Sequence, residues 1–139
     1  MISMPRASGV AAGALTLVAA LAACGAADQE SAARAVAERF TTAAAADPAT
    51  ACELLAPQTR KDLEDSSDQA CRSVITAQGI PADRHALRTQ VAGHSALVVL
   101  DHQTVFLGLF DSGWKVIAAG CEHTSSDAAT PYECVLKGG

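Results

Sequence analysis

The chain has 139 residues, a formal net charge of −5 and a hydrophobic fraction of 50%. This length allows one domain at most, and the 31 alanines inflate the hydrophobic fraction relative to the core that the chain can build. With ten basic against fifteen acidic residues, the composition argues against a nucleic-acid partner, which would require a clustered positive surface.

The N-terminal segment has the pattern of a secretory signal peptide. Arg6 is the only charged residue before Asp28, and residues 7–23 form an uncharged run of small and apolar side chains. The run ends in Leu21-Ala22-Ala23-Cys24, which resembles the lipobox of bacterial lipoproteins. That resemblance implies cleavage before Cys24 and attachment of a diacylglyceryl group to its sulfur, so that acyl chains anchor the protein on the extracytoplasmic side of the cell membrane.

This interpretation divides the chain into a signal peptide at 1–23, a lipidated tether at 24–28 and a single domain at 29–139. The alternative is an uncleaved membrane helix in which the cysteine has no role. Seventeen uncharged residues, many of them alanine or glycine, are marginal for crossing about 30 Å of hydrocarbon, so we favour cleavage.

The other four cysteines are an even number in an exported domain, which argues for disulfides. Three pairings are open, and the spacing favours the neighbours: Cys52 with Cys71, and Cys121 with Cys134. A zinc site is the competing interpretation. The cysteines lack CxxC spacing and exported thiols normally oxidise, so we expect no metal.

Helical patterns fill the first half of the domain. Residues 29–46 are rich in helix formers, with Asp28 as the expected N-cap and a buried stripe of Ala32, Val36, Phe40 and Ala43. Asp47-Pro48 should end this helix. A short helix carrying Cys52 should stop at Pro57, and a third helical stretch at 58–78 should break near Ser66-Ser67. Its acidic run, from Asp62 to Asp68, is expected to be a solvated face.

After Pro81 the pattern changes to strands joined by turns. Gly93-His94 should join a strand at 86–92 to one at 95–101, and His102-Gln103 should lead into a strand at 104–110. Asp111-Ser112-Gly113 fits a three-residue loop before a strand at 114–119. A last short strand near 132–136 should close the sheet. The fold class is therefore α+β, with two to three N-terminal helices packed on a curved four- to five-stranded antiparallel sheet and two disulfides.

These registers divide the strand residues between two faces. The nearly all-apolar face, which helices should cover, collects Leu87, Thr89, Val91, Ala96, Val98, Leu100, Val105, Leu107, Leu109 and Ile117. The mixed face collects Arg88, Gln90, Leu97, Val99, Phe106, Phe110, Trp114 and Val116. On the mixed face, Arg88, Phe106, Phe110 and Trp114 form a candidate binding face, unless the 122–131 loop covers it. With the faces reversed, the same residues would line a small-molecule pocket.

The order of elements resembles the cone-shaped fold of the nuclear-transport-factor-2-like superfamily, which includes ketosteroid-isomerase-like enzymes. The cysteine-bearing segments at 51–57, 113–121 and 131–134 are similar to those of small uncharacterised lipoproteins of high-GC Gram-positive bacteria. Neither resemblance implies an activity, because the cone fold hosts enzymes, carriers and dimerisation modules alike.

The catalytic evidence is weak. Cone-fold enzymes need an acid or base inside the cavity, and the expected inner face offers only Thr89. Asp101 and His102 are adjacent but fall in a turn, where a solvated tip is the usual outcome. The remaining histidines, His85, His94 and His123, are scattered over separate connections. We therefore expect no catalytic residues and no cofactor.

Three functions remain open. The first is a lipid-anchored, non-enzymatic module that binds a protein partner or a second copy through the candidate binding face. The second is a carrier or sensor of a small apolar ligand held in the cone. The third is a cone-fold isomerase or dehydratase.

Overall fold

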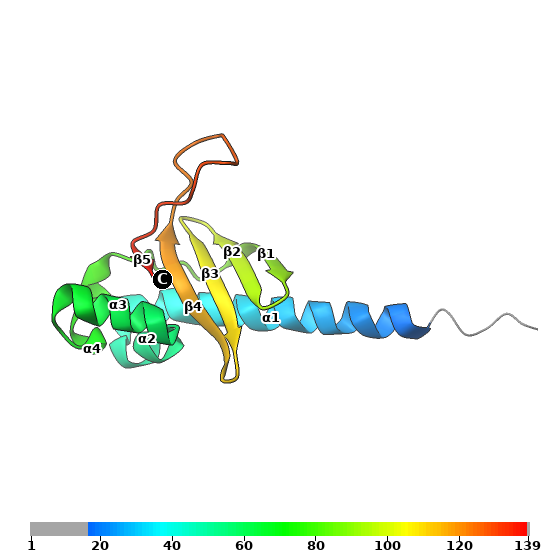
Figure 1. The fold of residues 1–139 in the computed structure, drawn as a ribbon, viewed down its shortest axis with the longest axis horizontal. Helices are drawn as coiled ribbons and strands as arrows, with labels where there is room; N and C mark the ends of the chain where they lie inside the picture. Colours follow the sequence, from blue (N-terminus) through cyan, green and yellow to red (C-terminus); the bar gives the residue numbers. More distant parts are fainter. Residues whose placement is uncertain (1–16, 139) are drawn as a thin grey trace, which may run out of the picture.

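The structure is a computed structural model that describes residues 17–138, with side chains from Gly25 onward. Residues 1–16 of the predicted signal peptide lie outside the described residues. The expected α+β fold is confirmed, with four helices, a five-stranded antiparallel sheet and two disulfides (Figure 1). The helical elements are α1 (Leu17–Ala46), α2 (Pro48–Leu54), α3 (Pro57–Ser67), α4 (Cys71–Val74) and the 3₁₀ turn η1 (Ile75–Gln78).

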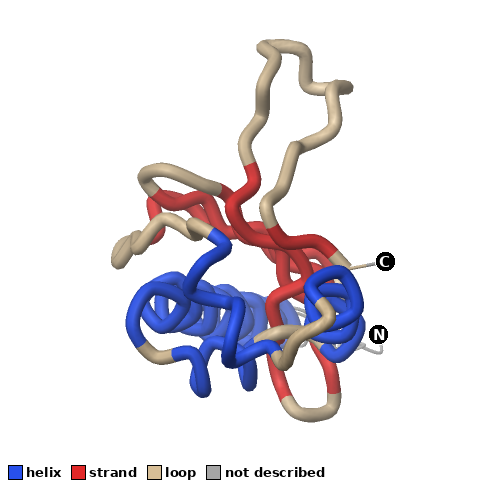
Figure 2. The backbone as a smooth tube through the Cα atoms, turned by 90° about the vertical axis from the view of Figure 1, so that its left-hand side faces the viewer, coloured by secondary structure: helices blue, strands red, loops and turns tan. Residues whose placement is uncertain are grey.

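The sheet is a simple meander. Each strand pairs with its neighbour in sequence, in the order β1-β2-β3-β4-β5. The strands are β1 (Ala86–Ala92), β2 (Ser95–Leu100), β3 (Thr104–Phe110), β4 (Gly113–Cys121) and β5 (Leu136–Lys137). Helix α1 crosses behind the sheet in Figure 1, and Figure 2 shows the helices gathered on one side of it. None of the helices that the structure describes therefore lies over the opposite face of the sheet.

Helix α1 begins earlier than the sequence suggested. It runs without interruption from Leu17 to Ala46, so Asp28 is not an N-cap and the expected tether at 24–28 is helical. The segment has no proline and is dominated by alanine, the strongest helix former, so nothing in it stops the helix at position 28. Among the described residues, no helix combines the length and the apolar character that a membrane span requires.

The buried stripe of α1 is made mostly of alanine. Ala33, Ala37 and Phe40 are fully buried and Ala44 is nearly so, and these steps of three or four residues place them on one helix face. The expected stripe was correct at Phe40 and Ala43 but wrong at Ala32, which is exposed. Small side chains allow the helix to approach the sheet closely, and the single large side chain, Phe40, fills the centre.

The predicted helix breaks are confirmed. Asp47 caps α2 by accepting a hydrogen bond from the backbone N–H of Thr50 at 3.2 Å, and Pro48 occupies the first turn, where a missing N–H does no harm. The third helical stretch breaks after Ser67, with Asp68 in the left-handed region at φ 52°. The Cys52–Cys71 disulfide joins α2 to α4 across this break.

Two strands bury different residues than the sequence suggested. Phe110 pairs with Gly113 across a two-residue turn, not the expected three-residue loop, so Trp114 pairs with Leu109 and faces the helices. A one-residue shift in register exchanges the two faces of a strand, so Trp114 and Val116 are buried and Ile117 lies on the opposite face.

A β-bulge produces the second difference. Ala86 pairs with Leu100 and Arg88 with Val99, so Leu87 is an extra residue in β1. It is 64% exposed, and the buried place that was expected for it is taken by Ala86. The space between α1 and the sheet is otherwise filled by side chains that are nearly or fully buried: Phe40, Val98, Val105, Leu107, Trp114 and Val116.

Candidate functional site

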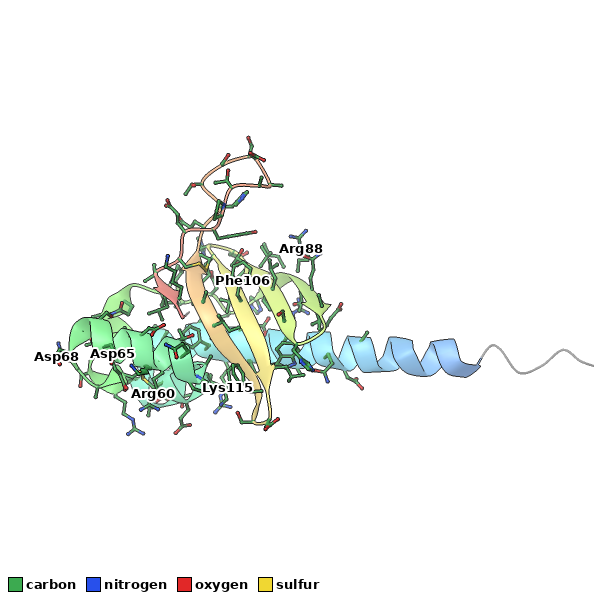
Figure 3. The ribbon with its side chains drawn as sticks, viewed as in Figure 1. Arg60, Asp65, Asp68, Arg88, Phe106 and Lys115 are labelled. Carbon is green, nitrogen blue, oxygen red and sulfur yellow. A yellow bond between two sulfur atoms is a disulfide. The ribbon has the colours of Figure 1, made fainter. Side chains whose placement is uncertain are left out.

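The uncovered face of the sheet carries a row of apolar side chains, which we call the aromatic face. The strand register places Leu97 opposite Phe106, and Arg88 opposite Val99 at the edge of the row. Figure 3 labels Phe106 over the sheet and Arg88 near β1. The aromatic face comprises Arg88, Leu97, Val99, Phe106, Phe110 and Ile117.

A glycine on β3 leaves room for two apolar side chains of this face to lie over it. Gly108 lies between Phe106 and Phe110 on β3, and a Cβ at this position would meet Ile117 Cδ1 at 2.8 Å and Phe110 Cε2 at 3.1 Å. The isoleucine and the phenylalanine therefore lie over the glycine backbone and make one continuous apolar surface. Phe110 remains 40% exposed, whereas Phe106 and Ile117 are half-buried.

The loop that follows β4 covers part of the aromatic face. This loop, residues 122–135, projects beyond the sheet in Figure 2 and is closed at its base by the Cys121–Cys134 disulfide. Tyr132 returns onto Phe106 in an edge-to-face contact, with ring centroids 5.1 Å apart, and the ring of His123 packs against Tyr132 at a tilt of 39°, with centroids 4.9 Å apart. The loop thus shields Phe106 and leaves Phe110 open.

Of the four residues predicted for the candidate binding face, the structure keeps three on the same side of the sheet. Trp114 is the correction, because it is only 4% exposed and lies against the helices. Its indole Nε1 donates a hydrogen bond to Gln29 Oε1 at 3.0 Å. Arg88 is exposed, and it stands at the opposite edge of the face from Phe110.

A second cluster centres on Asp83, which sequence analysis did not single out. Asp83 is 4% exposed, and its Oδ1 lies 2.7 Å from His102 Nδ1. Its Oδ2 accepts from Gln103 Nε2 at 3.2 Å, and its backbone oxygen accepts from the Thr41 hydroxyl. The aspartate therefore fixes the segment before β1 to both α1 and the β2–β3 turn.

His102 is the exposed member of this cluster. Its side chain is 75% exposed, and the hydrogen bond to Asp83, followed by the charge of Asp83, raises the pKa of His102 above its ordinary value. The adjacent Asp101 and His102 lie in an exposed turn, as expected, and the imidazole of His102 contacts Asp83. The partner lies 19 residues away, and no local spacing in the sequence signals it.

The described side chains that line the groove beside His102 include no free hydroxyl or thiol. It has a volume of about 340 Å³, and its lining includes Pro81, Gly120, Glu122 and Glu133. The sulfur of Cys134, which also lines it, is in a disulfide. Within residues 17–138, no group of three or more His, Cys, Asp or Glu side chains is arranged to hold a metal ion.

Comparisons of this chain with protein-family models, with curated proteins and with solved structures found no match.

Proposed function

We propose that this chain is a lipid-anchored extracytoplasmic interaction module that binds a protein partner, or a second copy of itself, through the aromatic face. The observation that carries the proposal is the exposed end of that face, where Phe110 and Ile117 cover Gly108 and none of the described helices covers them. Apolar clusters of this kind, with aromatic side chains near the centre and an arginine at the edge, are typical of protein interfaces.

The proposal assigns binding and not catalysis. His102, the partner of Asp83, lines a groove whose described lining residues carry no free hydroxyl or thiol, and the hydrogen bonds of Asp83 fix the chain segments that meet there. The carrier alternative would need space between α1 and the sheet, where buried side chains such as Phe40 and Leu107 are packed. The carrier alternative is one outcome of the experiments below.

The interface is tested with Phe106→Ser/Phe110→Ser in the membrane-anchored protein. We expect the unaltered chain to give a crosslinked complex and this variant to lose it, because both substitutions remove apolar side chains from the aromatic face. Val135→Ser is the matched control, since Val135 is 49% exposed and lines the groove beside His102. An unchanged crosslinking pattern in a folded double variant would refute the proposed interface.

The anchor is tested separately with Cys24→Ala. We expect the unprocessed precursor to accumulate without incorporation of labelled fatty acid, because the sulfur that would carry the lipid is gone. A processed, freely secreted product would contradict the lipoprotein proposal and would leave the interface test unaffected. A reproducible small-molecule mass that accompanies the folded protein would instead favour the carrier alternative.

A further inference from the structure

The two edges of the sheet differ in how their backbone groups are occupied. At the β4 edge, the backbone oxygens of Val116 and Ile117 accept hydrogen bonds from the N–H groups of Ala56 and Gly138, at 2.8 and 3.1 Å. Strand β5 pairs with the residues of β4 that follow. The β4 edge is therefore closed by other parts of the chain, and β1 forms the opposite edge of the sheet.

The start of β1 is closed as well. Ala86 donates its backbone N–H to Glu38 Oε1 at 2.8 Å, and its backbone oxygen accepts from Arg34 Nη2. The bulge at Leu87 follows. Capped groups and bulges protect a strand edge from uncontrolled pairing, and here they protect its first residues. Beyond the bulge, at 88–92, no described strand lies on the outer side of β1.

The register decides which backbone groups of this open part point outward. Ala92 and Ser95 flank a two-residue turn and form a hydrogen-bonded pair, and hydrogen-bonded and non-hydrogen-bonded pairs alternate along the two strands. The N–H and C=O groups of Gln90 therefore bond to β2. Those of Thr89 and Val91 point away from the sheet, where another strand could bond to them.

The N-terminal part of α1 lies beside this open edge. Helix α1 continues past β1 in Figure 1, and all residues at 25–32 are exposed. Ala27 and Ser31 line a groove of about 290 Å³ between α1 and β1, together with Leu87, whose side chain is 64% exposed. Since α1 runs on the helix side of the sheet, a strand added to β1 would lie over this part of α1 and cover its small side chains.

We propose that a second copy of this chain adds its β1 to this edge, antiparallel and around a two-fold axis at Gln90, so that the two sheets become one. A two-fold interface must be self-complementary. With Gln90 opposite its own counterpart, Thr89 lies opposite Val91 of the second copy, so their outward N–H and C=O groups form hydrogen-bonded pairs on both sides of the axis. The inference uses the edge of the sheet and does not depend on binding through the aromatic face.

This register places no like charges directly opposite each other. Gln90 meets the same amide of the second copy, and two amides can hydrogen-bond to each other. Arg88 falls opposite Ala92 of the second copy, so the two arginines are kept apart. Glu30 and Arg34, which line the groove between α1 and β1, carry opposite charges. The edge is therefore compatible with its own copy in sequence as well as in hydrogen bonding.

The register is tested with Gln90→Cys in the full chain, in the membranes of the cells that produce it. A residue on the axis lies in a non-hydrogen-bonded pair with its counterpart, with Cα atoms about 4.5 Å apart, which is within the range of a disulfide. Mild oxidation should therefore link two copies. Gln69→Cys is the matched control, because Gln69 is also exposed and precedes α4; it should give no more linked dimer than the unaltered chain.

The same axis is tested by charge, with the full chain in neutral detergent. Gln90→Lys and Gln90→Glu each place like charges opposite each other, and each should weaken self-association about fivefold in sedimentation equilibrium. A one-to-one mixture of the two variants should recover the dimer, because lysine then faces glutamate. Gln69→Lys and Gln69→Glu, alone or mixed, should leave the association unchanged.

Four results would overturn the proposal. The first is a Gln90→Cys chain that links no better than the unaltered chain, and the second is equal linking of Gln69→Cys, which would indicate random collision. The third is self-association that neither charged variant at Gln90 weakens. The fourth is loss of the Gln90→Cys link in a folded Phe106→Ser/Phe110→Ser chain, which would assign the dimer to the aromatic face.

Discussion

The indole Nε1 of Trp114 donates a hydrogen bond of 3.0 Å to the side-chain oxygen of Gln29, and this contact joins β4 to the N-terminal half of α1. Gln29 lies five residues after Cys24 in the same helix. A single side-chain pair thus links the sheet to the part of the helix nearest the predicted lipid. The bond also explains why a tryptophan, with its polar N–H, is accepted at a position that is 4% exposed.

Gln29→Ala should reduce the free energy of unfolding by about 1–3 kcal/mol, because it leaves the buried indole N–H without an acceptor. Trp114 is the only tryptophan, so its fluorescence reports the transition in urea without interference. Gln29→Glu is the informative control, since a carboxylate retains the acceptor. An unchanged urea midpoint for the alanine variant would show that water replaces the glutamine.

Thr89→Val should stabilise the protein by about 1 kcal/mol. Thr89 Oγ1 is buried, and among the buried side-chain oxygens and nitrogens of the described residues it is the one that lacks a hydrogen-bond partner. Valine retains the β-branched shape that suits a strand and removes the unsatisfied hydroxyl. A lower midpoint in urea than that of the unaltered chain would show that the hydroxyl has a bound partner.

Removal of the Cys52–Cys71 disulfide by Cys52→Ala/Cys71→Ala should lower the free energy of unfolding by about 3 kcal/mol. The bridge closes a segment with a sequence separation of 19 and joins two buried positions. Cys121→Ala/Cys134→Ala should have a different signature, because this bridge closes the base of the exposed 122–135 loop. Limited proteolysis should cut that loop in the second variant and spare it in the first.

The contact between Asp83 and His102 should make stability depend on pH. The pKa of His102 is raised in the folded state, so the stabilisation is fully present below the unfolded pKa of about 6.5 and is lost as the pH rises through the higher folded value. The difference in stability between the unaltered chain and His102→Gln should therefore be larger at pH 6 than at pH 9. A difference that grows with pH would contradict the assigned partner.

Local signals in the sequence were sufficient for most of the fold. Gly93 and His94 mark the turn between β1 and β2, and Asp47 with Pro48 marks the boundary between α1 and α2, because turns and caps depend on neighbouring residues. The pairing of the cysteines followed from the same order of elements. From these local signals the order of the helices and strands and the pairing of both disulfides could be predicted.

The features that could not be predicted depend on the exact number of residues in a turn or strand, or on contacts between residues that are far apart in the sequence. Asp111 and Ser112 form a two-residue turn, and the one-residue difference from the expected loop moved Trp114 to the other face. Leu87 became exposed because a bulge absorbs it. Asp83 meets His102 only after the chain has formed the first hairpin, so no spacing rule could identify the pair.

The continuity of α1 determines how the domain stands at a membrane. If Cys24 carries the lipid, α1 continues without a break from that residue through the core, so no hinge separates the lipid from the domain. Arg39 lies fifteen residues beyond Cys24, which at 1.5 Å per residue is about 22 Å along the helix axis. The aromatic face would then lie at a fixed height and orientation relative to the membrane, and a partner in the envelope would have to meet it there.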